Sequence, residues 1–147
     1  MNFKEKDAIA SFRSGYNCAQ AVLTTFTDDF KIDKKTALLI SSGFGAGMGR
    51  LQETCGAVTG AFMVAGIYNC QKYTNNVEKK DKMYAMIQNI NKMFVDIHGT
   101  SLCRELLNCD LKTEEGQKFV HENNLHEVVC EKCISSAINI LEELIEK

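Results

Sequence analysis

Apolar residues recur every three or four positions along most of this chain, which is the spacing of one face of an α-helix. The longest such run lies within residues 83–97 and consists of Met83, Met86, Ile87, Ile90, Met93, Phe94 and Ile97. A second run starts near Glu127 and consists of Cys130, Cys133, Ile134, Ala137, Ile138, Leu141, Leu144 and Ile145. No segment alternates with the period of two that is typical of a half-buried strand. The pattern therefore predicts an all-α protein.

Capping residues and glycines place three further helices before residue 45. We expect them over residues 3–13, over residues 17–30 with a cap at Asn17, and over residues 34–44 with a cap at Asp33. The helical spacing then predicts the residues that face inward. They are Phe3, Ile9, Phe12, Cys18, Val22, Phe26, Phe30, Ala37, Leu38 and Ile40.

The residue pattern in the middle of the chain predicts the remaining helices. One should run from Cys55 to about Cys70, after a cap at Thr54, and the polar residues 74–82 indicate a connection or a frayed helix start. Two weaker elements complete the chain, namely a short helix that carries Cys103 after a cap at Thr100 or Ser101, and a helix over residues 114–122. The whole chain, residues 1–147, is therefore expected to form a single-domain bundle of about six or seven helices.

Length and charge limit the kinds of partner. The chain has 147 residues, which fits one domain with one core, and its net charge of −2 argues against nucleic acid or an anionic membrane surface as the main partner. It contains no run of apolar residues long enough to span a bilayer, and its N-terminus lacks the apolar segment of a signal peptide. We therefore expect a cytoplasmic protein without membrane insertion.

Cysteine is unusually frequent for a protein of a reducing compartment. The seven cysteines are Cys18, Cys55, Cys70, Cys103, Cys109, Cys130 and Cys133. Stable structural disulfides are not the default in such a compartment, and an odd count leaves at least one thiol unpaired within the chain. The cysteine content therefore favours redox or metal chemistry.

Residues 41–66 gather glycines and other small residues around Cys55. Glycine occupies every second position from 43 to 49, and small residues recur four positions apart after the cysteine, as in Gly56 and Gly60. A helix face of small residues lets another helix approach closely. This face is compatible with tight internal packing, with a homodimer, or with a loop and helix that present Cys55.

Three of the cysteines follow candidate helix caps, and they are Cys18, Cys55 and Cys103. A helix N-terminus stabilises a nearby thiolate by roughly 0.3–1 kcal/mol, which lowers the thiol pKa by less than about one unit. Stronger activation needs a cation, and Arg50 and Arg104 are the candidates nearest in sequence. Either arginine could equally be a solvated surface charge.

Cys130 and Cys133 form a CxxC pair, which permits dithiol–disulfide chemistry or supplies half of a metal site. Together with Cys103 and Cys109 they give the spacing C-x5-C-x20-C-x2-C, which matches no standard zinc finger. The histidines near these cysteines are expected at the surface or in helix caps rather than on a metal, and they are His98, His121 and His126.

Four segments together carry a family resemblance. They are GYNCAQAVL at 15–23, GFGAGMGRLQETCGAVTGAFMVAG at 43–66, CRELLNCD at 103–110 and CEKCISSAINILEEL at 130–144. In this order they resemble the redox-active four-cysteine family that is defined by a CGAxxG motif and is also called the C-GCAxxG-C-C family. The resemblance covers nearly the whole chain. The segment after Gly66 departs from the Tyr-Gly ending expected of the family.

The resemblance implies a helical cytoplasmic domain with a redox role and four defining cysteines. Carried over position by position, these are Cys18, Cys55, Cys103 and Cys130. The resemblance leaves Cys109 and Cys133 as accessory thiols and places Cys70 outside the pattern.

Three functions remain open from the sequence. In the first, a thiol oxidoreductase, Cys55 attacks and Cys18 resolves, while Cys103 and Cys130 relay electrons or form a second pair with an unidentified redox partner. In the second, the same four cysteines bind zinc or an iron–sulfur cluster. In the third, a helical interaction protein uses its cysteines only to fill the core.

Overall fold

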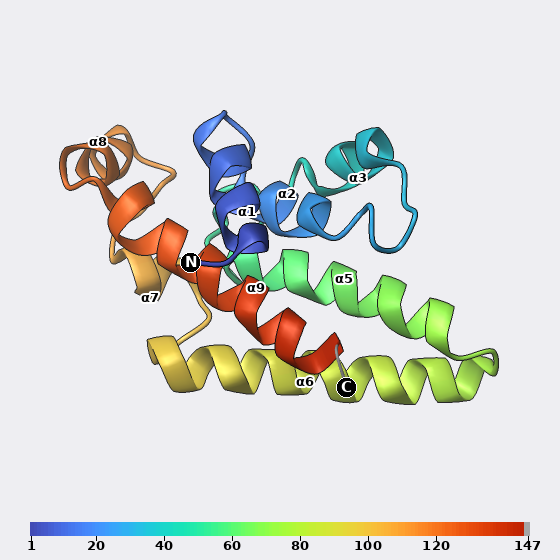
Figure 1. The fold of residues 1–147 in the computed structure, drawn as a ribbon. Coiled ribbons are helices and arrows are strands. Elements are labelled where there is room, and N and C mark those ends of the chain that lie inside the picture. The colour runs from blue at the N-terminus through green and yellow to red at the C-terminus, as the bar shows by residue number, and fades with distance from the viewer. Residues whose placement is uncertain (146–147) are drawn as a thin grey trace.

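Helices account for most of the chain, as the apolar spacing predicts. The structure is a computed structural model that describes residues 1–145, and within these residues it is all-α. The helices, which Figure 1 labels, are α1 (Phe3–Arg13), α2 (Cys18–Thr25), α3 (Lys34–Ser41), α4 (Gly45–Met48), α5 (Gly56–Lys72), α6 (Asn76–His98), α7 (Cys103–Leu107), α8 (Glu114–Glu122), the π-helical turn η1 (His126–Cys130) and α9 (Glu131–Ile145). The all-α prediction is confirmed, and short elements such as α4 and α7 make the segments more numerous than expected.

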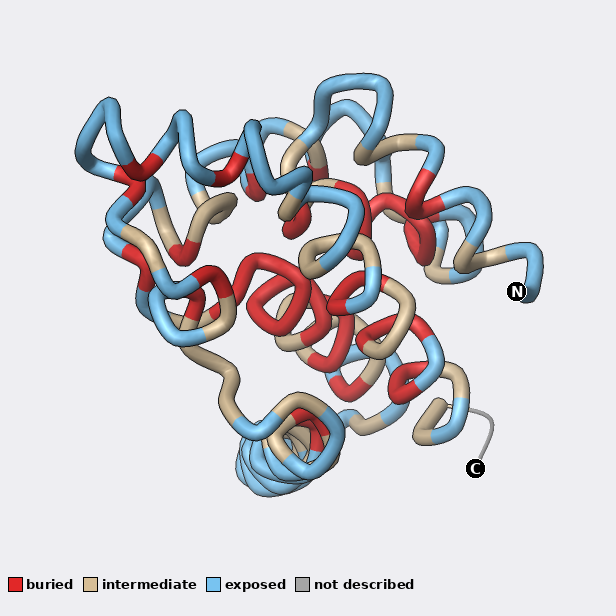
Figure 2. The backbone as a smooth tube through the Cα atoms, turned by 90° about the vertical axis from the view of Figure 1, so that its left-hand side faces the viewer, coloured by how far each residue is buried: buried red, intermediate tan, exposed pale blue. Residues whose placement is uncertain are grey.

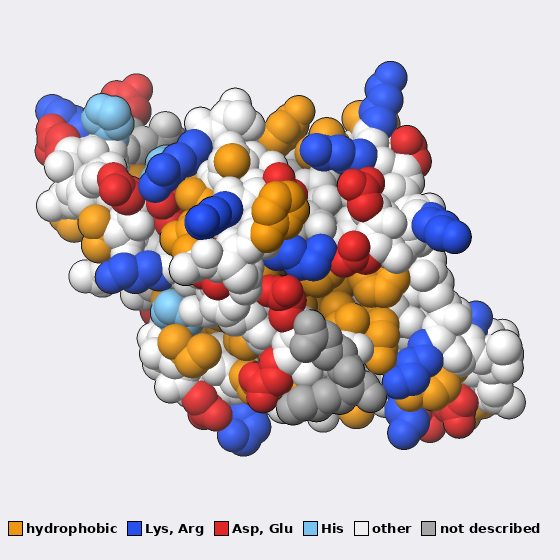
Figure 3. Space-filling model, in the orientation of Figure 1, with side chains coloured by type: hydrophobic (Ala, Val, Ile, Leu, Met, Phe, Trp, Pro, Cys, Tyr) orange, Lys and Arg blue, Asp and Glu red, His pale blue; other side chains and the backbone are white. Residues whose placement is uncertain are grey.

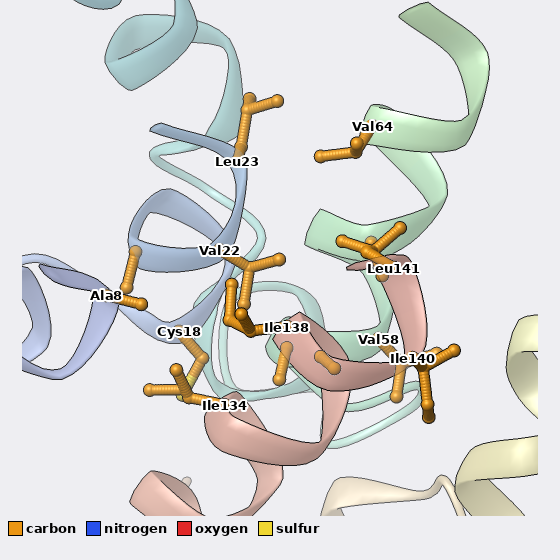
Figure 4. Close-up of a cluster of buried hydrophobic side chains, with 14 of the residues drawn as sticks. Ala8, Cys18, Val22, Leu23, Val58, Val64, Ile134, Ile138, Ile140 and Leu141 are labelled. Atoms are coloured by element: carbon orange, nitrogen blue, oxygen red, sulfur yellow. The ribbon is translucent and has the colours of Figure 1, made fainter. Parts of the chain in front are cut away.

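Helix α5 lies at the centre of the fold and packs against α2, α6 and α9. It runs beside the longer α6, and α9 crosses over both (Figure 1). The core joins apolar side chains of α2, α5 and α9, and Figure 4 shows Val22, Val58 and Ile138 among them. Cys18 lies beside Ile134 in the same view, so the core continues directly into the cysteine region.

The small-residue face of α5 is occupied from within the chain. A Cβ atom at Gly60 would stand 2.8 Å from the Ala19 carbonyl oxygen and 3.1 Å from the Val22 Cβ. Likewise, a Cβ at Gly56 would stand 3.1 Å from that of Cys18. These glycines allow α2 to pack closely on α5. Of the alternatives that the sequence left open for this face, the structure shows tight internal packing against α2, and the possible homodimer stays a prediction.

Two helices end earlier than expected. Helix α2 stops at Thr25 instead of reaching Phe30, and α3 stops at Ser41 instead of Phe44. In α2 the Thr25 hydroxyl donates to the Ala21 carbonyl, and the Thr27 hydroxyl donates to the Thr24 carbonyl. Such threonine hydroxyls compete for backbone acceptors and favour the end of a helix.

Two residues expected in the core are exposed, so these predictions were wrong. Phe3 is 82% exposed and Ile40 is 62% exposed. Phe3 opens α1, whose buried residues are Ala8 and Ile9. Helix α3 packs mainly against α2 and buries only Ala37 and Ser41, so a narrow stripe replaces the wider face that the apolar residues suggested.

Helix α6 is long and largely exposed, as Figure 2 shows for the segment at the bottom of that view. It begins at Asn76, where the Asn75 side chain accepts hydrogen bonds from Val77 and Glu78, and it ends at Gly99 in the left-handed conformation with φ 83°. The polar residues 74–82 are therefore mostly the first turns of this helix.

No helix within residues 1–145 is both long and apolar enough to cross a membrane. On the face shown in Figure 3, basic and acidic side chains are interspersed rather than gathered by sign.

Candidate functional site

Five cysteines line one cavity of about 530 Å³, and they are Cys18, Cys55, Cys103, Cys130 and Cys133. The cavity lies where the starts of α2, α5 and α7 meet the junction of η1 with α9, beside the glycine-rich loop. All seven cysteines of the chain are free thiols in this structure. The four cysteines named by the sequence therefore share one cavity with a fifth, Cys133, which the sequence marked only as accessory.

Two short extended segments place Cys55 and Cys103 near each other. The Cys55 amide donates to the Ser101 carbonyl at 2.8 Å, and the Cys103 amide donates to the Glu53 carbonyl at 2.8 Å. This antiparallel pairing fixes both cysteines immediately before or at a helix start. Cys55 itself is the N-cap of α5, with φ −49° and ψ 137°, so the expected cap at Thr54 was wrong.

Cys55 has the chemistry of an activated thiol. The interaction with the neighbouring Cys133 thiol is the largest cause that lowers the Cys55 pKa. The backbone amides of Ala57 and Val58 at the start of α5 lower this pKa further, whereas burial opposes them. The same contact and burial raise the pKa of Cys133. Cys55 is thus the more acidic thiol of this pair and Cys133 the less acidic one.

Cys18 forms a second contact, with Cys130. The interaction with Cys130 and burial raise the pKa of Cys18 well above its ordinary value. Cys18 is held at the first position of α2 by a capping box, in which Asn17 and Gln20 exchange hydrogen bonds at 2.9 Å. The thiols that shift each other's pKa most are therefore Cys55 with Cys133, and Cys130 has the largest effect on Cys18, whereas the sequence grouped Cys55 with Cys18.

A π-helical turn carries Cys130 into the cavity. The turn η1 spans His126–Cys130 and continues directly into α9, where Cys133 lies. The expected helix start near Glu127 agrees with this segment. π-helical turns are rare in proteins overall, and those that occur often lie at functional sites. No signal in the sequence identified this turn.

The glycine-rich loop forms a tight left-handed turn over the cavity. Residues 46–50 all have positive φ, and three of these residues are not glycine: Ala46, Met48 and Arg50. Left-handed backbone costs a non-glycine residue roughly 1–2 kcal/mol. The turn is held by hydrogen bonds such as that from the Glu53 amide to the Gly47 carbonyl at 3.0 Å. Gly47 is required here, because a Cβ would stand 2.5 Å from the Gln52 Cα.

Gln52 is a site residue that sequence reasoning missed. It is 3% exposed and has φ 55°. Its side-chain nitrogen Nε2 donates to the Cys109 carbonyl at 2.9 Å and lies 3.9 Å from the Cys103 sulfur. Its side-chain oxygen Oε1 accepts a hydrogen bond from the Leu111 backbone amide at 2.8 Å. A glutamine between a loop and a helix carries no pattern that reveals such contacts. Gln52 ties the glycine-rich loop to the segment after α7.

The remaining cysteines differ in their surroundings. Burial raises the pKa of Cys103 to about 12, against a smaller opposing effect of the Gln52 amide. Burial and the neighbouring Asp110 raise the pKa of Cys109, which does not line the cavity. Cys70 is exposed near the end of α5, outside the cavity. Cys55 is thus the cavity thiol whose pKa is lowered.

Neither candidate arginine is among the groups that lower the pKa of Cys55 or Cys103. Arg104 forms a salt bridge of 3.0 Å with Glu53, and Arg50 is exposed and lines the cavity. Their roles as accessory residues stay predictions.

The histidines occupy separate places. His98 contacts the Ser136 hydroxyl at 2.8 Å, His121 is exposed, and His126 lines the cavity edge-on to Phe12. Within residues 1–145, no three or more His, Cys, Asp or Glu side chains are arranged to hold a metal ion. The thiols around the cavity are nevertheless ligand types that suit zinc or an iron–sulfur cluster.

The fold and the cavity define an all-α protein with clustered free thiols. A family model described as "Putative redox-active protein (C_GCAxxG_C_C)" matches residues 16–144. The chain belongs to this family, as the resemblance in its sequence indicated. No curated protein and no solved structure matches the chain.

Proposed function

We propose that this chain is a thiol–disulfide redox protein in which Cys55 is the attacking thiolate and Cys133 the resolving thiol. The observation that carries the proposal is that Cys55 and Cys133 line one cavity and interact so that the Cys55 pKa is lowered and the Cys133 pKa is raised. The thiolate is the nucleophile in thiol–disulfide exchange, so a lowered pKa supplies the reactive form at lower pH.

The exchange proceeds in two balanced steps. The Cys55 thiolate attacks one sulfur of a substrate disulfide, a mixed disulfide forms, and the first substrate thiolate leaves and takes a proton from water. Cys133 then loses its proton and attacks the Cys55 sulfur of the mixed disulfide, which releases the second substrate thiolate. The substrate gains two electrons, and the protein ends with a Cys55–Cys133 disulfide that an external dithiol reduces.

Cys18 and Cys130 supply a second dithiol beside the first. Their interaction and their position on the same cavity support a role as a relay, in which they reduce the Cys55–Cys133 disulfide and are themselves oxidised to a disulfide. We assign the cytoplasm as the compartment, since free thiols persist there, and cell fractionation tests this assignment.

A second candidate is a metal- or cluster-binding module, and the gathering of five cysteines on one cavity favours it. Cys18, Cys55, Cys103 and Cys130 would supply thiolate ligands to zinc or an iron–sulfur cluster. In that case the sulfurs would have to turn toward one centre.

One experiment separates the two functions. The full chain is purified without oxygen and without chelator, analysed for iron and zinc, and titrated with a small disulfide while free thiols are counted. Redox function predicts metal-free protein that loses thiols in pairs, and Cys55→Ser abolishes the first pair while Cys70→Ser, a matched control outside the cavity, preserves it. Stoichiometric metal that disappears in Cys55→Ser and Cys103→Ser would instead establish the second candidate.

A further inference from the structure

We propose that the cavity takes a small disulfide that carries a carboxylate, and that Arg50 binds this negative group. The inference rests on the proposed redox function and adds the class of substrate to it. Three features of the cavity support it: the depth of the thiols, the charge of the lining residues and the backbone of Arg50.

The depth of the thiols favours a small molecule over a folded protein. Cys55 is 7% exposed and Cys133 is 1% exposed, although both line the cavity. A volume of about 530 Å³ lies within the usual range of small-ligand pockets. A small disulfide matches a volume of this size, whereas a disulfide held on the surface of a folded protein reaches a buried sulfur less readily.

The charge of the lining residues favours an anion. Among the described residues that line the cavity there is no aspartate, glutamate or lysine, and Arg50 supplies a guanidinium. The other arginines, Arg13 and Arg104, are held in salt bridges by Glu131 and Glu53. Arg50 forms no salt bridge with any acidic side chain within residues 1–145. Its guanidinium is therefore free to pair with a substrate carboxylate.

The backbone conformation of Arg50 is consistent with a binding role for its side chain. Arg50 has φ 67°, a conformation that glycine adopts at lower cost and that Gly47 and Gly49 adopt in the same turn. Strained non-glycine residues cluster at binding sites, where the side chain is needed despite the backbone. Ala46 and Met48 share this backbone conformation, so the place of Arg50 in the cavity lining, rather than its φ alone, marks it as the anion-binding residue. Apolar lining residues such as Leu106 and Val129 would contact the body of the substrate.

The reaction is the exchange described above, with the substrate oriented. The carboxylate pairs with Arg50, the substrate S–S bond faces Cys55, and the Cys55–substrate S–S bond forms as the substrate S–S bond breaks. The leaving thiolate takes a proton from water, and Cys133 completes the reduction.

Rates with three probe disulfides test the charge preference. The probes are dithiobis(nitrobenzoate), which is anionic, dithiodipyridine, which is uncharged near neutral pH, and cystamine, which is cationic. The full chain with Cys70→Ser removes the exposed thiol, and the Cys55 peptide is quantified by mass spectrometry. Arg50→Gln should slow the anionic probe about three- to tenfold, leave the uncharged probe unchanged and speed the cationic probe. Arg50→Glu should enlarge both changes, and Arg50→Lys should restore most of the anionic rate.

Control experiments distinguish a failure of this substrate inference from a failure of the proposed redox function. Lys80→Gln removes an exposed cation of α6 outside the cavity, so it should leave all three rates unchanged. An equal effect of Arg50→Gln on all probes, or oxidation of Cys55 by the disulfides of folded insulin as fast as by the small anionic probe, would overturn the inference and leave the redox function standing. Failure of every probe to modify Cys55 would overturn the proposed function as well.

Discussion

Cys55, at the start of α5, and Cys133, in the first turn of α9, line the same cavity, and their interaction lowers the Cys55 pKa and raises the Cys133 pKa. This interaction makes the two thiols differ in acidity, because it favours the thiolate form of Cys55 and the protonated form of Cys133. Such an asymmetric pair is what sequential attack and resolution require.

The pH dependence of Cys55 alkylation tests this asymmetry. Since the Cys55 pKa is lowered, its reaction with iodoacetamide should reach half of its maximal rate below the ordinary thiol pKa of about 9. Cys133→Ala removes the interacting thiol and should move this midpoint upward. Cys130→Ala, which removes a cavity thiol that contacts Cys18 instead, should leave the midpoint in place. An unchanged midpoint in Cys133→Ala would contradict the assignment.

Two glycines of α5 should respond in opposite directions to alanine. Gly60→Ala places a Cβ against the backbone of α2 and should lower the free energy of unfolding by about 1–3 kcal/mol. A Cβ at Gly66 would meet only the Met83 sulfur, at 4.0 Å. Gly66→Ala should therefore raise the free energy of unfolding by about 0.5–1 kcal/mol. Urea denaturation of both variants checks the signs, and stabilisation by Gly60→Ala would refute the close packing of α2 on α5.

Gln52 should matter more for stability than its neighbours. Gln52→Ala leaves the Leu111 amide and the Cys109 carbonyl without their buried partner, so we expect a loss of about 2–4 kcal/mol in the free energy of unfolding. Leu51→Ala, at an exposed position of the same loop, should change it by less than about 0.5 kcal/mol. Equal losses in the two variants would show that the loop does not depend on the Gln52 amide.

Stability should fall at alkaline pH partly because of Cys103. Its pKa is raised to about 12 in the folded chain, so the unfolded chain releases this proton first, and the stabilisation present below pH 9 is lost as the pH rises toward 12. Between pH 9 and 10 this thiol alone should cost about 1 kcal/mol. Urea titrations under reducing conditions should therefore give a shallower decline for Cys103→Ala, and an identical decline would argue against a buried neutral thiol.

Periodicity predicted the helices because core-facing residues recur with the helical repeat. It failed for Phe3 and Ile40, because an apolar residue at the right spacing still needs a neighbouring element that covers its side chain. It also missed the early end of α2, which depends on hydroxyl contacts of Thr25 and Thr27 rather than on apolar spacing.

The cysteine positions were predictable from motif and order, whereas their contacts were not. The sequence grouped Cys55 with Cys18, since their helices were expected to converge, but the thiol contacts depend on where α9 crosses α5 and on the π turn before it. The contacts of Gln52 were not predictable for the same reason, because its hydrogen-bond partners lie far along the chain, in the segment after α7.

Mapping the first disulfide tests the central claim most directly. The reduced full chain is treated with less than one equivalent of a small disulfide, quenched in acid, and digested for mass spectrometry of linked peptides. The account predicts that the Cys55 peptide is joined to the peptide that carries Cys133, and that Cys133→Ser leaves a persistent mixed disulfide on Cys55. A first bond between Cys55 and Cys18, or oxidation that leaves Cys55 reduced, would contradict it.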